Sequence, residues 1–156
     1  MSTVTDLISR FFADLLAYPH PLVNHFVIAL FIVSVVLEFY GRWNPAIRFT
    51  AWVMLALGAL ATIPTVITGL IAHFPYEETS AIGAIETHEQ LGLATAGIFM
   101  ALTIWRWRSR RTDSAAPASW LYLASAIAGL VVLTAAGVTG GTLVYRMGVG
   151  VEQLVK

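Results

Sequence analysis

Four histidines supply the side chains of this 156-residue chain that are best suited to hold a metal or a redox cofactor. They are His20, His25, His73 and His88. Cysteine is absent, which excludes thiolate-ligated iron–sulfur clusters and covalently attached c-type haem. Any redox cofactor must therefore depend on histidine or methionine ligands.

The elements that position these histidines are predicted to be membrane-spanning helices. In this chain 58% of the residues are hydrophobic and 12% are charged, whereas about a quarter of the residues of a soluble domain are charged. At about 1.5 Å per helical residue, four apolar segments are long enough to cross a hydrocarbon core of about 30 Å. These segments are 21–40, 49–72, 88–107 and 120–139. Continuous apolar runs favour helices, and short connections make them antiparallel neighbours. We predict an all-α membrane protein, an antiparallel four-transmembrane-helix bundle forming one domain over 1–156.

A further amphipathic helix is predicted over 3–17, before the first span. Its apolar residues recur at helical spacing, and Asp6, Arg10 and Asp14 lie away from them, so it should lie in the membrane interface. A cleaved signal peptide is not favoured, because there is no basic leading region or small-residue cleavage site. Pro19 should end this helix and Pro21 should begin the next one, with His20 as its N-cap.

The orientation is predicted from the arginines. Six of them gather at one end of the predicted bundle, where all five tryptophans also lie: Arg42, Arg48, Arg106, Arg108, Arg110 and Arg111. The positive-inside rule places this end in the cytoplasm. Because the number of spans is even, both termini should then face outward.

All four histidines should lie at the opposite, outer end. His20 and His25 differ by about 140° around one helix, so they should not ligate the same iron. The first and third spans run in the same direction, which brings His25 and His88 to a similar depth. We predict His25 and His88 as the axial ligands of a haem b, with His73 as a substitute for either. Each histidine alone is better explained as an interfacial anchor, but four together favour a functional site.

A porphyrin needs space beside its ligands. Ala29 follows His25 and Gly92 follows His88, each one helical turn deeper. Small residues are also the usual packing residues of transmembrane helices, so this pattern permits a haem without requiring one. Arg146 is predicted to neutralise the haem propionates.

The remaining polar residues have less specific interpretations. His20 is predicted to contact the haem ring or its propionates. Glu38 should pair with Arg42 one turn away, and Thr87 should cap the third span. The outer loop carries an acidic cluster, which is either a docking face for a basic carrier or a solvated loop: Glu77, Glu78, Glu86 and Glu89.

The features that carry a family resemblance are the motifs HPLVNHF and GGTLVYRMGVGV, the GLIAH end of the second span, and His88. The chain resembles the bacterial membrane family catalogued as domain of unknown function 2231. The resemblance runs from about His20 to Val151. It implies a four-helix bacterial membrane protein, and the orientation predicted from the arginines then places both termini on the periplasmic side of the inner membrane. Relatives joined to Rieske or cytochrome c modules imply electron transfer. His20 and His25 match the opening motif, and Met147 stands where the family often has a histidine.

The expected function is therefore a b-type cytochrome-like subunit in the lipid bilayer that relays electrons with a cytochrome c, a Rieske protein or a larger respiratory or photosynthetic complex. A cofactor-free structural or assembly subunit is the first alternative, and a copper site of histidines with Met147 is the second. No internal repeat is apparent, which disfavours a transporter. No nucleophile stands with a base, so an enzyme is not expected. The balanced charge of nine basic and nine acidic residues gives no reason to expect nucleic acid.

Overall fold

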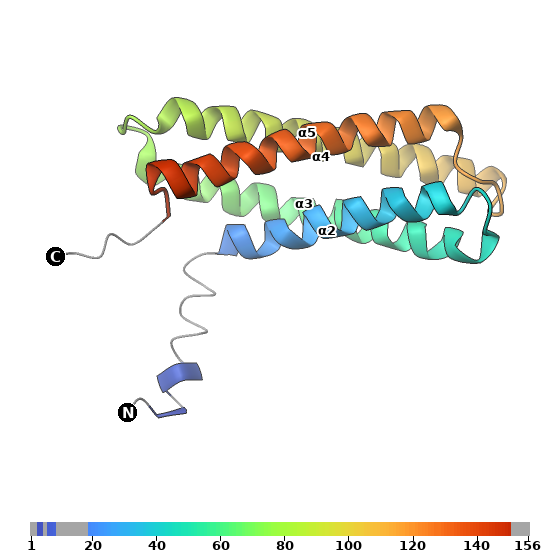
Figure 1. Ribbon diagram of the computed structural model, residues 1–156, viewed down its shortest axis with the longest axis horizontal. Helices are drawn as coiled ribbons and strands as arrows, with labels where there is room; N and C mark the ends of the chain where they lie inside the picture. Colours follow the sequence, from blue (N-terminus) through green and yellow to red (C-terminus); the bar gives the residue numbers. More distant parts are fainter. Residues whose placement is uncertain (1–2, 5, 9–18, 151–156) are drawn as a thin grey trace.

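The structure is a computed structural model that describes residues 3–4, 6–8 and 19–150, and the regular structure of these residues is entirely helical (Figure 1). The long helices are α2 (Pro19–Tyr40), α3 (Arg48–His73), α4 (Ile82–Thr112) and α5 (Trp120–Met147), and short 3₁₀ helices at Pro45–Ile47 and Phe74–Tyr76 flank α3. The all-α prediction is confirmed. Most of the interfacial helix expected over 3–17 lies outside the described residues.

Three segments of the described chain have the length and apolar composition of membrane spans: Pro19–Tyr40, Pro45–Tyr76 and Trp120–Met147. Large apolar side chains such as Leu60 and Val131 are exposed on their outer surfaces, which suits contact with lipid. The helix α4 is not among these candidate spans. Its apolar stretch is bordered by polar residues at both ends, so a fourth span over 88–107 stays a prediction.

Two helices are longer than the hydrophobic pattern indicated. The helix α4 begins at Ile82 and not at Thr87, whose hydroxyl donates to the Gly83 carbonyl inside the helix. The helix α5 continues past Thr139 to Met147. It ends at Gly148, which adopts a left-handed φ of 68° that glycine tolerates without strain.

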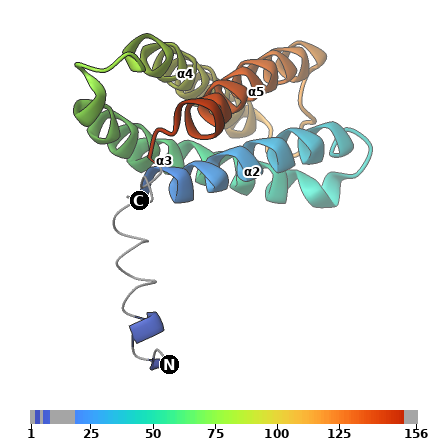
Figure 2. The same ribbon diagram turned by 60° about the vertical axis from the view of Figure 1, so that its left-hand side comes forward.

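The four helices form two hairpins, α2–α3 and α4–α5, which cross each other face to face (Figures 1 and 2). Contacts are more numerous within each hairpin than between the hairpins. Between them, the Phe31 ring of α2 stacks on the Phe99 ring of α4, with ring centres 3.8 Å apart. Both phenylalanines are fully buried, so the centre of the molecule is a contact between α2 and α4.

The two hairpins are structurally equivalent. Three pairs of residues meet between α2 and α4, and the members of each pair are 68 residues apart in the sequence: His20 with His88, Phe31 with Phe99, and Glu38 with Arg106. Residues that meet their own equivalents lie on a twofold axis. An approximate twofold axis therefore runs between α2 and α4.

The partner helices α3 and α5 are also equivalent, with matching residues that are 71 positions apart in the sequence (129 − 58). Gly58 of α3 lies against the Phe31 ring, and Gly129 of α5 lies against the Phe99 ring. The expectation of no internal repeat is therefore wrong at the level of structure. When 20–39 is aligned with 88–107, only the histidine and the phenylalanine are identical, so sequence similarity alone does not reveal the repeat. Such parallel repeats are known in membrane proteins.

Candidate functional site

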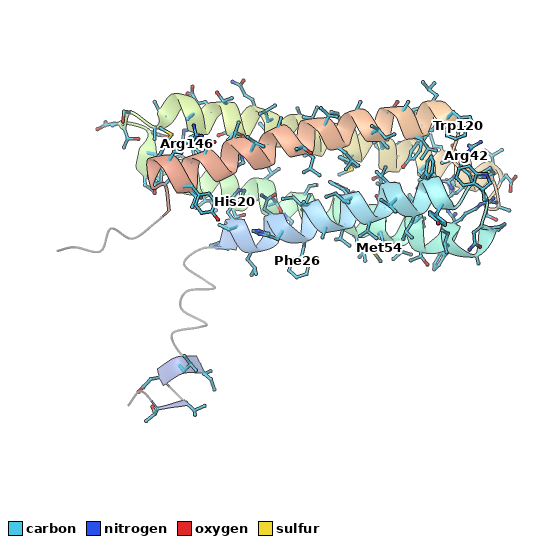
Figure 3. All side chains as sticks on the ribbon, viewed as in Figure 1. His20, Phe26, Arg42, Met54, Trp120 and Arg146 are labelled. Carbon is cyan, nitrogen blue, oxygen red and sulfur yellow. The ribbon has the colours of Figure 1, made fainter. Side chains whose placement is uncertain are left out.

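His20 and His88 face each other across the twofold axis, at the end of the bundle where His20 lies near the start of α2. Their ring centres are 6.3 Å apart and their planes are almost perpendicular, at 86°. We call these two residues the histidine pair. Figure 3 shows His20 at the same end of the molecule as Arg146, with Arg42 and Trp120 at the opposite end.

The His20 ring is held in place by α3, the other helix of its hairpin. Its Nδ1 lies 3.0 Å from the carbonyl oxygen of Thr65 on α3, and 3.4 Å from the Thr68 hydroxyl oxygen. A carbonyl oxygen can only accept a hydrogen bond, so Nδ1 carries the proton and donates it. In the neutral imidazole, Nε2 then keeps its lone pair and is free to act as a ligand.

The His88 ring is held in the same way by α5. Its Nδ1 lies 3.0 Å from the carbonyl oxygen of Ala136 and 3.2 Å from the hydroxyl oxygen of Thr139. The same tautomer follows. A backbone carbonyl on one ring nitrogen is the usual support of a histidine whose other nitrogen binds a metal. The histidine pair therefore offers two Nε2 lone pairs, on rings whose centres are 6.3 Å apart.

A glycine lies beneath each ring of the pair. A Cβ atom added at Gly69 would lie 2.9 Å from Cε1 of His20, and one added at Gly140 would lie 2.9 Å from Cε1 of His88. Such contacts are too short for any side chain to be accommodated without moving the ring. These two glycines therefore set the close approach of each histidine to its partner helix.

The predicted partner of His88 lies elsewhere. His25 is exposed, and its Nδ1 contacts the carbonyl oxygen of Pro21 on its own helix. The buried face of α2 contains Val27, Phe31 and Glu38, and His20 shares the face that meets α4. Because His25 is about 140° away from His20 around the helix, it points outward. The structure thus brings His20, and not His25, to His88.

The other residues named from the sequence are dispersed. Ala29 is exposed, and Gly92 has open space beside it. His73 Nδ1 lies 2.7 Å from Glu89 Oε2, a contact that ties the end of α3 to α4. Arg146 is exposed and makes no hydrogen bond or ion pair with the residues that the structure describes.

The opposite end of the bundle contains a buried ion pair that sequence reasoning missed. Arg106 Nε donates to Glu38 Oε1 at 2.6 Å, and each residue is only 1% exposed. Arg106 was expected at the membrane surface, and Glu38 was expected to pair with Arg42. Arg42 instead donates to the Ala118 carbonyl and packs over the Trp120 ring. The pair has the same 68-residue spacing as the histidine pair, a relation that becomes visible only once the structure shows the repeat.

Within the described part of the chain, no group of three or more side chains of the metal-binding types is assembled. Fold and site together define a helical membrane protein with one pair of facing histidines on its internal twofold axis. The family model described as "Predicted membrane protein (DUF2231)" matches residues 19–153, and the chain belongs to this family. The resemblance noted in the sequence is thereby confirmed. No curated protein and no solved structure matches the chain.

Proposed function

We propose that this protein is a membrane electron-transfer subunit that binds one haem b between His20 and His88. The observation that carries the proposal is the histidine pair itself. Two imidazoles from different helices face each other, and the carbonyls of Thr65 and Ala136 leave both Nε2 atoms available. The ligand pair suggested by sequence, His25 with His88, changes to His20 with His88 because His25 is exposed.

The donor set and the spacing fit a haem that would be held by the two imidazoles of the pair. The porphyrin supplies four nitrogens, so only two protein ligands are needed, whereas a metal held by side chains alone generally takes three or four. The ring centres of the histidine pair are 6.3 Å apart, which is within the combined reach of two metal–imidazole bonds of about 2 Å each. A bound haem b would supply a one-electron redox centre.

The chain's own residues would orient the ligands and make room for the group. Thr65 and Ala136 keep the imidazoles in the ligating tautomer, and Gly69 and Gly140 let the rings lie close to α3 and α5. Gly137 on α5 has no neighbouring atom within 4 Å of an added Cβ, which leaves space at the same end of the bundle. Arg146 is exposed there and is suited to pair with a propionate.

The direct test is a pyridine haemochrome assay on protein purified from a haem-sufficient bacterial host. We expect about one haem b per chain, and loss of that haem in His20→Ala and in His88→Ala. The matched controls are His25→Ala and His73→Ala, which change histidines outside the pair and should retain haem. Circular dichroism verifies that each variant keeps its helices. Wild-type protein without haem, or haem retained in both pair variants, would contradict the proposal.

The proposal also includes four spans, with α4 crossing the membrane and the histidine pair near the periplasmic surface of the bacterial inner membrane. The burial of Arg106 and its neutralisation by Glu38 support a crossing by α4, because they reduce the cost of an arginine at its end. At the periplasmic surface the haem could exchange electrons with a cytochrome c or a Rieske protein.

The topology can be tested by cysteine labelling, since the chain has no cysteine of its own. Ser80 lies before α4 and Ser114 lies after it, and both are exposed. A membrane-impermeant maleimide applied to spheroplasts should label Ser80→Cys and should reach Ser114→Cys only after lysis. Equal labelling of both variants in intact spheroplasts would mean that α4 does not cross.

A further inference from the structure

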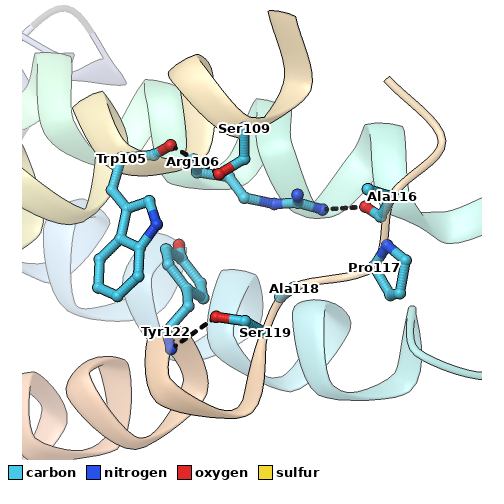
Figure 4. A pocket seen from close by; sticks show the side chains of 8 residues that line it. All are labelled: Trp105, Arg106, Ser109, Ala116, Pro117, Ala118, Ser119 and Tyr122. Atoms are coloured by element: carbon cyan, nitrogen blue, oxygen red, sulfur yellow. Dashed lines mark hydrogen bonds between the residues drawn. The ribbon is translucent and has the colours of Figure 1, made fainter. Parts of the chain in front are cut away.

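A second candidate site lies at the opposite end of the bundle from the histidine pair. It is a pocket of about 230 Å³ between the last part of α4 and the start of α5 (Figure 4). Its lining includes Trp105 and Arg106 from α4 and Tyr122 from α5. Drug-sized ligands occupy pockets of about 300–1,000 Å³, so this pocket suits a smaller group such as a single substituted ring.

A polar side chain without a partner faces this pocket. Tyr122 is 3% exposed, and its hydroxyl makes no hydrogen bond with the described residues, whereas a buried tyrosine hydroxyl usually has a partner. Figure 4 shows the hydroxyl directed into the space between Trp105 and Arg106. The pocket therefore contains a hydrogen-bonding group that a ligand can satisfy.

Arg106 adds donors without adding net charge. Its Nε donates to Glu38 and one terminal nitrogen donates to the Ala116 carbonyl, which leaves further N–H groups of the five that a guanidinium carries. Because Glu38 neutralises the guanidinium, Arg106 itself brings no net charge to the pocket. Hydrogen-bond donors without net charge favour a neutral ligand that carries carbonyl oxygens.

The walls and the position of the pocket specify the ligand further. The Trp105 and Tyr122 rings meet edge to face, with centres 5.7 Å apart, and flat ring ligands pack well against such surfaces. Trp105, Pro117 and Ser119 are exposed at the rim, so a ligand can enter from the surface. The tryptophans at this end suit the membrane interface. The expected ligand is therefore planar, neutral and lipid-soluble.

We infer that the pocket between α4 and α5 binds the head group of a quinone. A quinone carbonyl would accept hydrogen bonds from the Tyr122 hydroxyl and from Arg106, the ring would lie against Trp105, and the tail would leave through the exposed rim. Neither the haem proposal nor the histidine pair is needed for this inference, because the two sites lie at opposite ends of the bundle.

The test is equilibrium binding of ubiquinone-1 and of menadione to the full chain in lipid nanodiscs, with empty nanodiscs as the background. Wild-type protein should show saturable binding of at least one of these quinones. Ala116→Phe fills the pocket with a ring and should weaken that binding at least tenfold. Thr112→Phe adds the same bulk outside the pocket lining and is the matched control, which should bind as the wild type does.

Tyr122→Phe removes only the hydroxyl and should weaken binding several-fold. His88→Ala, measured in parallel, should bind quinone normally, so a failure of the haem proposal is distinguishable from a failure of this one. Binding that does not saturate above the empty nanodiscs would mean that the pocket holds only water and would overturn the inference. Equal binding by wild type and Ala116→Phe would overturn it as well.

Discussion

The two ends of the bundle carry residue pairs at equivalent positions of α2 and α4, but the two residues hydrogen bond directly to each other in only one of these pairs. Glu38 and Arg106 hydrogen bond to each other at 2.6 Å. His20 and His88 instead donate from Nδ1 to carbonyls of α3 and α5. Opposite charges satisfy each other, whereas two imidazoles in the same tautomer present two lone pairs that cannot bond to one another. They can share only a third partner, such as a proton or a metal.

This difference shows how one repeated framework can serve two purposes. A residue on the twofold axis meets its own equivalent, so identical residues there produce a symmetric ligand pair. Where the two repeats carry a carboxylate and a guanidinium, the same geometry produces an ion pair that links the hairpins. Four sets of substitutions, in order of decreasing expected effect, test this comparison.

The largest effect on stability is expected at the ion pair. Glu38→Leu leaves Arg106 buried without its partner and should lower the free energy of unfolding by about 3–5 kcal/mol. The double variant Glu38→Leu/Arg106→Met removes both charges and should recover most of that loss. Reversible unfolding in detergent measures both. Equal destabilisation of the single and the double variant would mean that the pair contributes through packing and not through its charges.

The second effect concerns the glycine beneath a ring of the histidine pair. Gly140→Ala forces the His88 ring to move and should cost about 1–3 kcal/mol of unfolding free energy. Gly137→Ala is the matched control, because it lies in the same helix beside open space and should be neutral or stabilising by up to about 1 kcal/mol. The same unfolding assay applies. Indistinguishable variants would argue against the close ring contact.

A smaller effect is expected from the threonines that contact the histidines. Thr139→Val removes the hydroxyl 3.2 Å from His88 Nδ1 and should cost about 0.5–1.5 kcal/mol. Thr68→Val removes the longer contact of 3.4 Å to His20 and should cost less. Thermal unfolding of the two variants side by side measures the difference. A larger loss at Thr68 would reverse the order that these distances predict.

The smallest effect is expected at the exposed histidine. His25→Ala removes a ring whose contact is with its own helix, so the free energy of unfolding should change by no more than about 0.5 kcal/mol. His20→Ala, measured in parallel, should be clearly more destabilising because the ring packs on Gly69 and binds the Thr65 carbonyl. Similar losses for the two variants would contradict their different placement.

Local sequence patterns predicted which segments of this protein form helices better than they predicted the first and last residues of those helices. The apolar segment 21–40 lies within α2, and 49–72 lies within α3, because hydropathy over about 20 residues is a property of the chain itself. The start of α4 was missed because Thr87 bonds within the helix and does not cap it. The end of α5 was missed because glycines such as Gly140 were not expected inside a continuing helix.

The candidate site was less predictable, because it depends on which way each helix faces. Depth along a helix follows from residue number, so the placement of His20, His25 and His88 at one end could be expected. The choice between His20 and His25 depends on the rotation of α2, and packing sets that rotation. Phe31 against Gly58 and Phe99 is the contact that decides it.

By itself the sequence determined a cysteine-free, helical membrane protein with its histidines and its arginine cluster at opposite ends, because composition and spacing along the chain are local properties. Only the tertiary structure decided that His20 meets His88, that Glu38 meets Arg106, and that the two hairpins are equivalent. These contacts join residues 68 positions apart, and they form only when close packing fixes the rotation and crossing of both hairpins.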